Sequence, residues 1–374
     1  MPQRRPSTLT TGRGFTERGR EGRISGYVFK LMRESTGLTQ EQLAERLNVD
    51  GTTVQGWESG RRPLMAVPVG SYLALKHTLL GLPVAPRLLS QLDLAMEADR
   101  FLGYILSADR ADTTGHPLAS WVITRSFTDL LAWPFTKQIP VVLSGVASPR
   151  ARRGPVPSGP ALAADEARHV FTHLKVIAEL ADVTQVDGML LRRQAHYVAG
   201  FDGSSETADW LAVMQHAEER RIRQTAEWTP AWAVVRSGAH TLARFGDRDA
   251  LAHFIRGSLG SDECEVANLN YWAYWLGELA EPQIADTFMI EPQAWHGTRL
   301  LDHLIAKLYA ANPYIDVVAH TLWSLLTSRP ALLPQAVSRV MPPLTRTLDD
   351  DGISDQSRRE LQEVFYALRM SQRR

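Results

Sequence analysis

Apolar residues recur at intervals of three and four along most of the chain, which is the spacing of one face of a helix. Within residues 38–63, two short apolar stripes follow each other closely. The stripes consist of Leu43, Ala44 and Leu47, then Val54 and Trp57. This spacing predicts two short helices joined by a tight turn, and the small Ala44 lets the two helices cross closely.

The residues before each stripe are ones that start helices. Thr39 and Gln42 have the spacing of a capping box, in which each side chain bonds the backbone N–H of the other. Asp50 stands at the equivalent position before the second helix. Asn48 lies in the turn, and asparagine tolerates the left-handed backbone that such a turn requires. The capping residues, the turn residue and the apolar stripes therefore all predict two helices joined by a turn.

The second of these helices has a polar outer face. If Val54 and Trp57 face inward, the helical period turns five residues outward, namely Gly51, Thr52, Gln55, Gly56 and Ser59. Each glycine costs a helix up to about 1 kcal/mol relative to alanine, and a close approach of the backbone to DNA would explain both. We predict that this face lies in a major groove; the alternative is an ordinary helical hairpin without a DNA partner.

Residues 24–82 resemble the Cro and lambda-repressor-like helix-turn-helix family, also called XRE. The matching residues are Leu38, Thr39, Gln40, Leu43, Ala44, Val49, Thr53, Val54, Trp57, Glu58, Gly60 and Pro63. The resemblance implies a compact helical domain that binds double-stranded DNA. Asn48 replaces the usual glycine, and Gly51 and Gly56 stand where members often carry side chains that contact bases. Direct contacts with bases should therefore be few.

The outward residues receive distinct expected roles. Gln55 is predicted to bond a base edge, adenine being its natural bidentate partner, and Thr52 to contact a thymine methyl or a phosphate. Gln40 at a helix start, with Arg61 and Arg62 beyond the second helix, is predicted to hold phosphates. The full predicted DNA-contacting set is Gln40, Gly51, Thr52, Thr53, Gln55, Gly56, Ser59, Arg61 and Arg62.

Charge is unevenly distributed, although the 374 residues are formally neutral. The first 82 residues carry a net charge of +5, which leaves −5 for the remainder. Residues 1–23 are predicted to form a disordered basic arm, either simply solvated or reaching a minor groove or phosphates. The basic stretch 144–160 is rich in proline and glycine and is predicted to be a loop; solvation is favoured over DNA contact for its arginines, Arg150, Arg152 and Arg153.

Other features bear on the compartment. A single cysteine, Cys264, excludes an internal disulfide and a multi-cysteine zinc site. No stretch has the apolar length of a membrane span, and the Arg-rich start lacks the apolar centre of a signal peptide. We therefore expect a cytoplasmic protein without membrane contact. Only five of the 41 basic residues are lysines, which is typical of a GC-rich bacterial genome.

The flanking segments predict the limits of the domains. Helices over residues 24–36 and 69–82 complete a DNA-binding domain of residues 24–82. Residues 88–106 predict a helix that docks on the next domain or pairs with its copy in a dimer. The rest of the connecting segment, residues 83–143, is mostly helical but contains strand-like runs, so its structure stays open.

Residues 161–374 repeat helical runs with short Gly, Asp or Pro breaks. The predicted helices are residues 165–180, 186–201, 206–223, 230–245, 250–259, 263–279, 298–311, 313–327 and 354–370. Because no strict period is visible, we predict an all-α chain with a lambda-repressor-like domain followed by a large irregular solenoid or bundle. The last helix is amphipathic and, with residues 88–106, is a candidate dimer interface.

No catalytic, cofactor or metal site is predicted. His169 and His173 have the spacing of two metal ligands on a helix, but no third ligand is indicated, so a packing or surface role is favoured. One predicted helix is crowded with four aromatic residues, Tyr271, Trp272, Tyr274 and Trp275. Core filling is the favoured interpretation, and a pocket for an apolar ligand or peptide is the alternative.

These patterns predict a sequence-specific DNA-binding transcriptional regulator of bacterial XRE type that is not an enzyme. A homodimer would bind an operator of two half-sites, and the helical body would sense a small-molecule or peptide effector. The first alternative is a DNA-binding assembly or DNA-maintenance protein whose body recruits another protein. An enzyme tethered to DNA by the N-terminal domain is the second.

Overall fold

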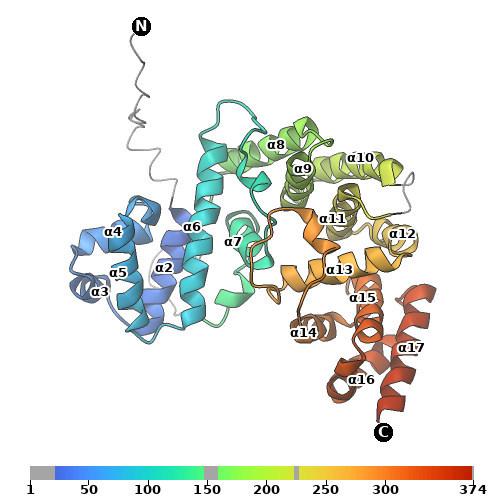
Figure 1. Cartoon of the computed structure of the whole chain (residues 1–374). Helices are drawn as coiled ribbons and strands as arrows, with labels where there is room; N and C mark the ends of the chain where they lie inside the picture. The colour runs from blue at the N-terminus through green and yellow to red at the C-terminus, as the bar shows by residue number, and fades with distance from the viewer. Residues whose placement is uncertain (1–21, 147–158, 223–226, 373–374) are drawn as a thin grey trace. The chain divides into compact units, whose positions relative to one another are not determined.

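A computed structural model describes residues 22–146, 159–222 and 227–372, and these residues form sixteen α-helices and no strand (Figure 1). This confirms the predicted all-α class, with a helix-turn-helix domain followed by a helical body. Contacts divide the chain into two units, Met1–Ala108 with Asp129–Ala167, and Asp109–Thr128 with Arg168–Arg374. Nearly all of the predicted basic arm, together with Arg150, Arg152 and Arg153, lies outside the described residues.

The first unit contains the predicted pair of short helices. Its complete helices are α2 (Arg23–Thr36), α3 (Gln40–Leu47), α4 (Gly51–Glu58), α5 (Val69–Leu80) and α6 (Pro86–Leu106), with a 3₁₀ turn, η1 (Leu64–Ala66), before α5. The capping box is confirmed, because Gln42 N–H donates to Thr39 Oγ1 (3.2 Å) and Thr39 N–H donates to Gln42 Oε1 (2.9 Å). Asn48 adopts the left-handed conformation, with φ 52° and ψ 47°. Asp50 is the N-cap residue before α4, but its side chain makes no capping hydrogen bond.

The core of the first unit holds α2 against the end of α4. The rings of Phe29 and Trp57 meet edge to face with centroids 5.8 Å apart, and both side chains are buried. Gly26 makes the approach possible, because a Cβ at this position would lie only 2.3 Å from the Trp57 carbonyl oxygen. The two short helices are therefore held in place by α2 as well as by each other.

Helix α6 belongs to the same unit and packs along α2. The buried carboxylate of Asp99 accepts hydrogen bonds from the backbone N–H groups of Ile24 (2.9 Å) and Ser25 (2.8 Å) in the first turn of α2. The buried apolar residues of α6 are Leu88, Leu89, Leu92, Ala95, Ala98, Phe101, Leu102 and Ile105. Of the two interpretations of this apolar face, packing within the chain is the one that the burial supports, and pairing of the same face with a second copy is not supported.

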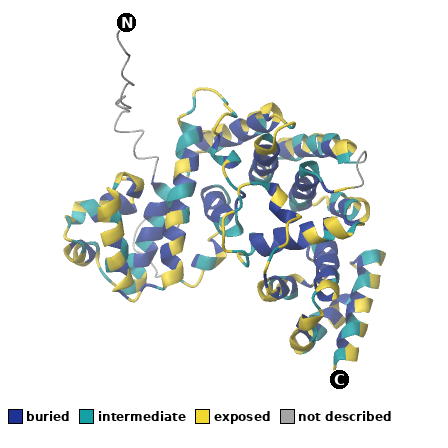
Figure 2. Cartoon of the chain, viewed as in Figure 1, coloured by how far each residue is buried: buried dark blue, intermediate teal, exposed yellow. Residues whose placement is uncertain are grey.

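The second unit is a series of packed helices. They are α9 (Val186–Ala199), α10 (Ser205–Ile222), α11 (Pro230–Arg244), α12 (Arg248–Ser258), α13 (Asp262–Trp275), α14 (Thr298–Lys307), α15 (Ile315–Ser328), α16 (Leu333–Leu348) and α17 (Asp355–Ser371). Helices α7 (Arg125–Thr136) and α8 (Ala164–Leu180) cross the boundary between the units. Helix α11 packs against α9, α10 and α12, and α15 packs against α12, α13, α14 and α17. Figure 2 shows buried residues along the inner sides of these helices.

Three elements differ from the expectation. The strand-like runs form no strand among the described residues; Val141–Leu143 is a 3₁₀ turn, and α7 continues through Pro134. Helix α16 was not predicted, since Pro342 and Pro343 lie inside it. The apolar face of α17 packs on α15 and α16, so the predicted dimer surface on the last helix is also covered. Among the described residues, no helix combines the length and apolarity needed to cross a membrane.

Candidate nucleic-acid interface

Helix α4 presents a polar surface, as its apolar spacing predicts. Val54 and Trp57 are buried, whereas Thr52, Gln55 and Ser59 are exposed. The three exposed residues lie one turn apart along the helix or its C-terminal cap, so their side chains share one face. A helix with this width and exposed polar groups fits a major groove.

The two glycines of α4 have different surroundings. Gly51 is open, because the nearest atom to a Cβ placed there would be Glu41 Cγ at 4.0 Å. Gly56 is buried because the side chain of Arg62 covers it. A Cβ added at Gly56 would lie 3.0 Å from the Cδ atom of Arg62. The predicted outward exposure of Gly56 is therefore wrong. Of these two glycines, only Gly51 leaves room for a ligand to approach the backbone closely.

Two arginines after α4 fold back toward the helix. The backbone N–H of Arg62 donates to the Gly56 carbonyl (3.0 Å), and its Nη1 donates to Oγ1 of Thr53 (2.8 Å). Arg61 Nε donates to Oγ of Ser59 (3.2 Å). Both arginines are exposed, so their charges lie beside the polar face of α4, where they can reach phosphates of a bound duplex.

Glu58 is a residue whose role the sequence patterns missed. Its carboxylate is buried and accepts hydrogen bonds from Gln40 Nε2 (2.6 Å) and from Arg33 Nη2 (3.1 Å) and Nε. Arg33 also donates from Nη1 to the Leu38 carbonyl (2.8 Å). The spacing in the sequence could have indicated this role. Glu58 follows Val54 by four residues and so lies on the inward face, where a buried carboxylate needs hydrogen-bond partners.

The environment of Gln40 differs from the one expected for a phosphate contact. Its side-chain amide is bonded to Glu58 within the protein. The neighbouring Glu41 carboxylate lies at the N-terminus of α3, where its own backbone N–H and then the Thr39 hydroxyl lower its pKa. That negative charge opposes a phosphate at the same helix end. Direct phosphate binding by the Gln40 side chain is thus less favourable than the sequence indicates.

A hollow of about 440 Å³ borders the polar face of α4 within the first unit. Gln55 and Ser59 line it from α4, and Tyr27 and Lys30 line it from α2. Arg23 closes another side and is paired with Glu166 (2.8 Å). Lys30 therefore lines the same hollow as Gln55, and the sequence patterns did not identify it.

The described residues show no alternative metal site. Among them, no group of three His, Cys, Asp or Glu side chains is placed to hold a metal ion. His173, one of the two histidines with metal-ligand spacing, stacks on His116 in the second unit with ring centroids 5.6 Å apart. Burial lowers the pKa of both rings, to about 3 for His116.

Comparison with known proteins identifies the same part of the chain. Residues 26–87 match the family described as Helix-turn-helix domain. No curated protein and no solved structure matches the chain. The match spans α3 and α4 together with most of α2, all of α5 and the start of α6. The N-terminal part of the chain is therefore a helix-turn-helix DNA-binding domain.

Proposed function

We propose that the protein is a sequence-specific transcriptional regulator of bacterial XRE type, acts in the cytoplasm and is not an enzyme. The observation that carries the proposal is the exposed polar face of α4 within a matched helix-turn-helix domain. Gln55 reads a base edge, and Thr52 contacts a thymine methyl or a phosphate. Arg61, Arg62 and Lys30 hold phosphates on either side and set the orientation of α4.

A dimer would supply the contacts that one small domain lacks. The helices first favoured for pairing bury their apolar faces, but α5 leaves Val69, Leu73 and Leu80 exposed by 75%, 50% and 52%. Their spacing places the three on one side of α5. We propose that a second copy covers this stripe, so that two α4 helices bind half-sites about one helical turn, ~34 Å, apart.

The helical second unit would then act as the effector-binding body of the regulator. Its helices are packed around two large clusters of buried hydrophobic residues, which would hold the side chains of a ligand site in fixed positions. We propose a small-molecule effector for this body.

Selection of bound sites from random duplexes by the full chain tests the function. The expected result is enrichment of one motif with two related half-sites; retention of duplexes without any shared motif would contradict it. Leu73→Glu tests the dimer, with Val213→Glu on α10 as its control because Val213 is also exposed (70%). Sedimentation should show dissociation for Leu73→Glu alone, and a monomeric wild-type chain would overturn the dimer proposal.

A further inference from the structure

Two buried arginines of the second unit share one aromatic ring but differ in their partners. Arg193 of α9 forms a bidentate pair with Asp286, at 2.8 and 2.7 Å, and its guanidinium lies 5.4 Å from the Tyr271 ring centroid. Arg236 of α11 lies 4.3 Å from the same ring and is 3% exposed. Its Nε donates to Asn268 (3.0 Å), which carries no charge. Among the described residues, a carboxylate thus compensates the charge of Arg193 and none pairs with that of Arg236.

Arg236 is one of four residues in this region with an unpaired buried nitrogen. Within the part of the chain that the structure describes, Arg236 Nη2, His240 Nε2, Arg244 Nη1 and Trp272 Nε1 have no hydrogen-bond partner. No carboxylate of the described residues forms an ion pair with Arg236 or Arg244. Buried polar groups are nearly always hydrogen-bonded, and an unpaired buried charge is costly. A concentration of four in one place therefore requires a physical reason.

These groups lie together because of helical spacing. Arg236, His240 and Arg244 follow one another at intervals of four on α11, so they share one face. Trp272 of α13 faces them, since its ring is 5.3 Å from the Arg236 guanidinium and 5.9 Å from the His240 ring. Tyr314 also stacks against His240, with ring centroids 6.2 Å apart.

The local potential is positive. Burial lowers the pKa of Arg236 to about 10. Burial, together with the nearby charges of Arg236 and Arg244, lowers the pKa of His240 to about 3, although its hydrogen bond to the Arg236 carbonyl acts in the opposite direction. His240 is therefore neutral near pH 7. Cation–π contacts with Tyr271 and Trp272 stabilise Arg236 in part, but they leave its Nη2 hydrogen atoms without an acceptor.

We propose that Arg236, His240 and Trp272, with Arg244 one turn further along α11, form a buried binding site for an oxyanion, and that hydrogen phosphate is the form that matches their hydrogen-bonding groups. The guanidinium and indole groups donate to its oxygens. The Nδ1 atom of His240 donates to the Arg236 carbonyl (2.9 Å), which leaves Nε2 of the neutral ring as an acceptor. Hydrogen phosphate carries the O–H that this acceptor needs, whereas sulfate of the same size does not.

The site gives the proposed regulator a phosphate-type effector, and in this respect it rests on the proposed function. Phosphate binding is measured without DNA. A failure to bind phosphate can therefore be told apart from a failure of the proposed DNA-binding function. The phosphate group could come from free phosphate or from the phosphate monoester of a metabolite. Comparing the binding of inorganic phosphate with that of glycerol phosphate distinguishes these two sources. The monoester loses most of its last proton above pH 6, so it should bind less well at pH 8 than inorganic phosphate.

The test uses the full chain and three substitutions. Arg236→Met removes the uncompensated charge and preserves bulk, so the variant should fold at least as well as wild type without anions. Trp272→Phe keeps a ring and removes the N–H donor. Arg256→Met is the matched control, because Arg256 is exposed on α12 of the same unit. Equilibrium dialysis with labelled phosphate should give one bound ion per chain for wild type and Arg256→Met, weaker binding for Trp272→Phe, and none for Arg236→Met.

Thermal unfolding at constant ionic strength gives a second readout. A hundredfold excess of phosphate over Kd should raise the unfolding midpoint of wild type by about 5 to 10 °C relative to sodium chloride. Phosphate and sulfate also stabilise proteins by exclusion from their surface, but this effect is shared by all variants. Equal midpoint shifts in wild type and Arg236→Met, or no bound phosphate in wild type, would overturn the site. Equal binding of sulfate and phosphate would contradict the role of His240.

Discussion

Arg62 donates a hydrogen bond from Nη1 to Oγ1 of Thr53 at 2.8 Å, and its side chain thereby lies on α4. This position covers Gly56 and keeps the charge beside the exposed face of the helix. An arginine predicted to lie beyond the recognition helix is therefore part of the surface of that helix. Its contacts with Thr53 and Gly56 therefore hold a positive charge against α4, the helix that also carries the exposed Gln55.

Replacement of Arg62 tests its role as a phosphate contact. Arg62→Ala should weaken binding to specific and random duplexes similarly, because the phosphate charge is the same in both. The slope of log K against log salt should fall in magnitude by about one. Fluorescence anisotropy at several salt concentrations measures both effects. Arg256→Ala in the second unit should leave the slope unchanged, and an unchanged slope for Arg62→Ala would place Arg62 outside the interface.

Gln55 has a different expected signature, because a base contact is specific to sequence. Gln55→Ala should cost about 1 to 3 kcal/mol on the selected site and relax preference at one base position. Binding to random DNA should change little. The measurement is a competition series in which each base pair of the site is varied. Equal loss on selected and random duplexes would show that Gln55 does not read a base.

The local features of the domain could be predicted because they follow from residues close in sequence. Thr39 and Gln42 cap α3 as their spacing requires, and Asn48 supplies the left-handed turn. The partners of Glu58 and the covering of Gly56 by Arg62 depend on chain segments that fold back, so helical periodicity could not reveal them. The DNA-contacting roles assigned to the outward residues stay predictions.

Glu58 connects α4 to α2 and α3 through Arg33 and Gln40, so its removal should destabilise the domain. Glu58→Ala leaves Arg33 without its principal carboxylate, and the side chain of Arg33 is only 11% exposed. The free energy of unfolding should fall by about 2 to 4 kcal/mol. Urea unfolding monitored by the fluorescence of Trp57 alone, with the other tryptophans replaced, reports on this unit. Glu45→Ala, at an exposed position of α3, should have little effect, and equal effects of the two would refute the connection.

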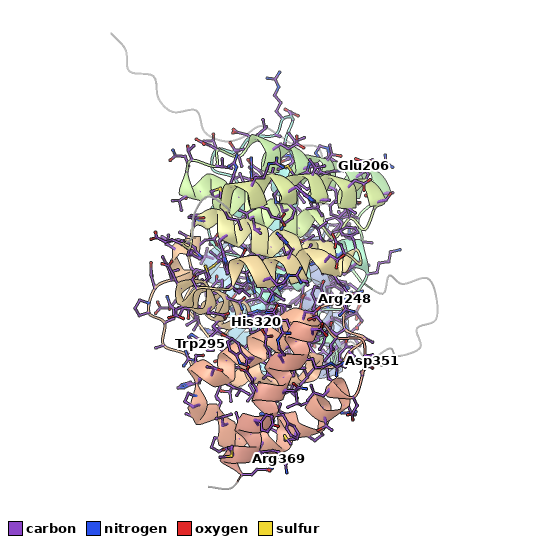
Figure 3. All side chains as sticks on the ribbon, turned by 90° about the vertical axis from the view of Figure 1, so that its right-hand side faces the viewer. Glu206, Arg248, Trp295, His320, Asp351 and Arg369 are labelled. Carbon is purple, nitrogen blue, oxygen red and sulfur yellow. The ribbon has the colours of Figure 1, made fainter. Side chains whose placement is uncertain are left out.

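His320 of α15 should make the second unit less stable at high pH. Its side chain, labelled in Figure 3, lies between two carboxylates. Its Nε2 lies 2.7 Å from Oε1 of Glu265 of α13, and its Nδ1 lies 2.8 Å from Oε1 of Glu360 of α17. Burial alone would lower its pKa, but the hydrogen bonds and charges of Glu265 and Glu360 raise the pKa to about 9. Because the unfolded value is about 6.5, the stabilisation is complete below pH 6.5 and is lost as the pH rises through 9.

The expected loss between pH 6.5 and pH 10 is up to about 3 kcal/mol of unfolding free energy. The measurement compares wild type with His320→Gln, which stays neutral over this range. The difference between the two proteins should shrink as the pH rises, since other titrating groups affect both alike. A difference that is constant with pH would show that His320 is not protonated in the folded chain.

The body could be predicted only in outline. Its helices follow the apolar periodicity, but α16 contains two prolines and forms because Ala336, Val340 and Leu344 are buried. The apolar faces of α6 and α17 were correctly placed on helices, yet periodicity does not say which surface covers them. In the same way, the intervals of four between Arg236, His240 and Arg244 are visible in the sequence. That no carboxylate of the described residues pairs with either arginine is a property of the packed helices.

The most direct test of sequence-specific binding by α4 is a comparison of two duplexes at about 0.15 M salt. One carries the site selected by the full chain, and the other has the same base composition in shuffled order. A specific regulator should bind the selected duplex at least about a thousandfold more tightly, and Gln55→Ala should reduce this ratio. Equal affinities for the two duplexes, unchanged in Gln55→Ala, would contradict sequence-specific recognition by α4.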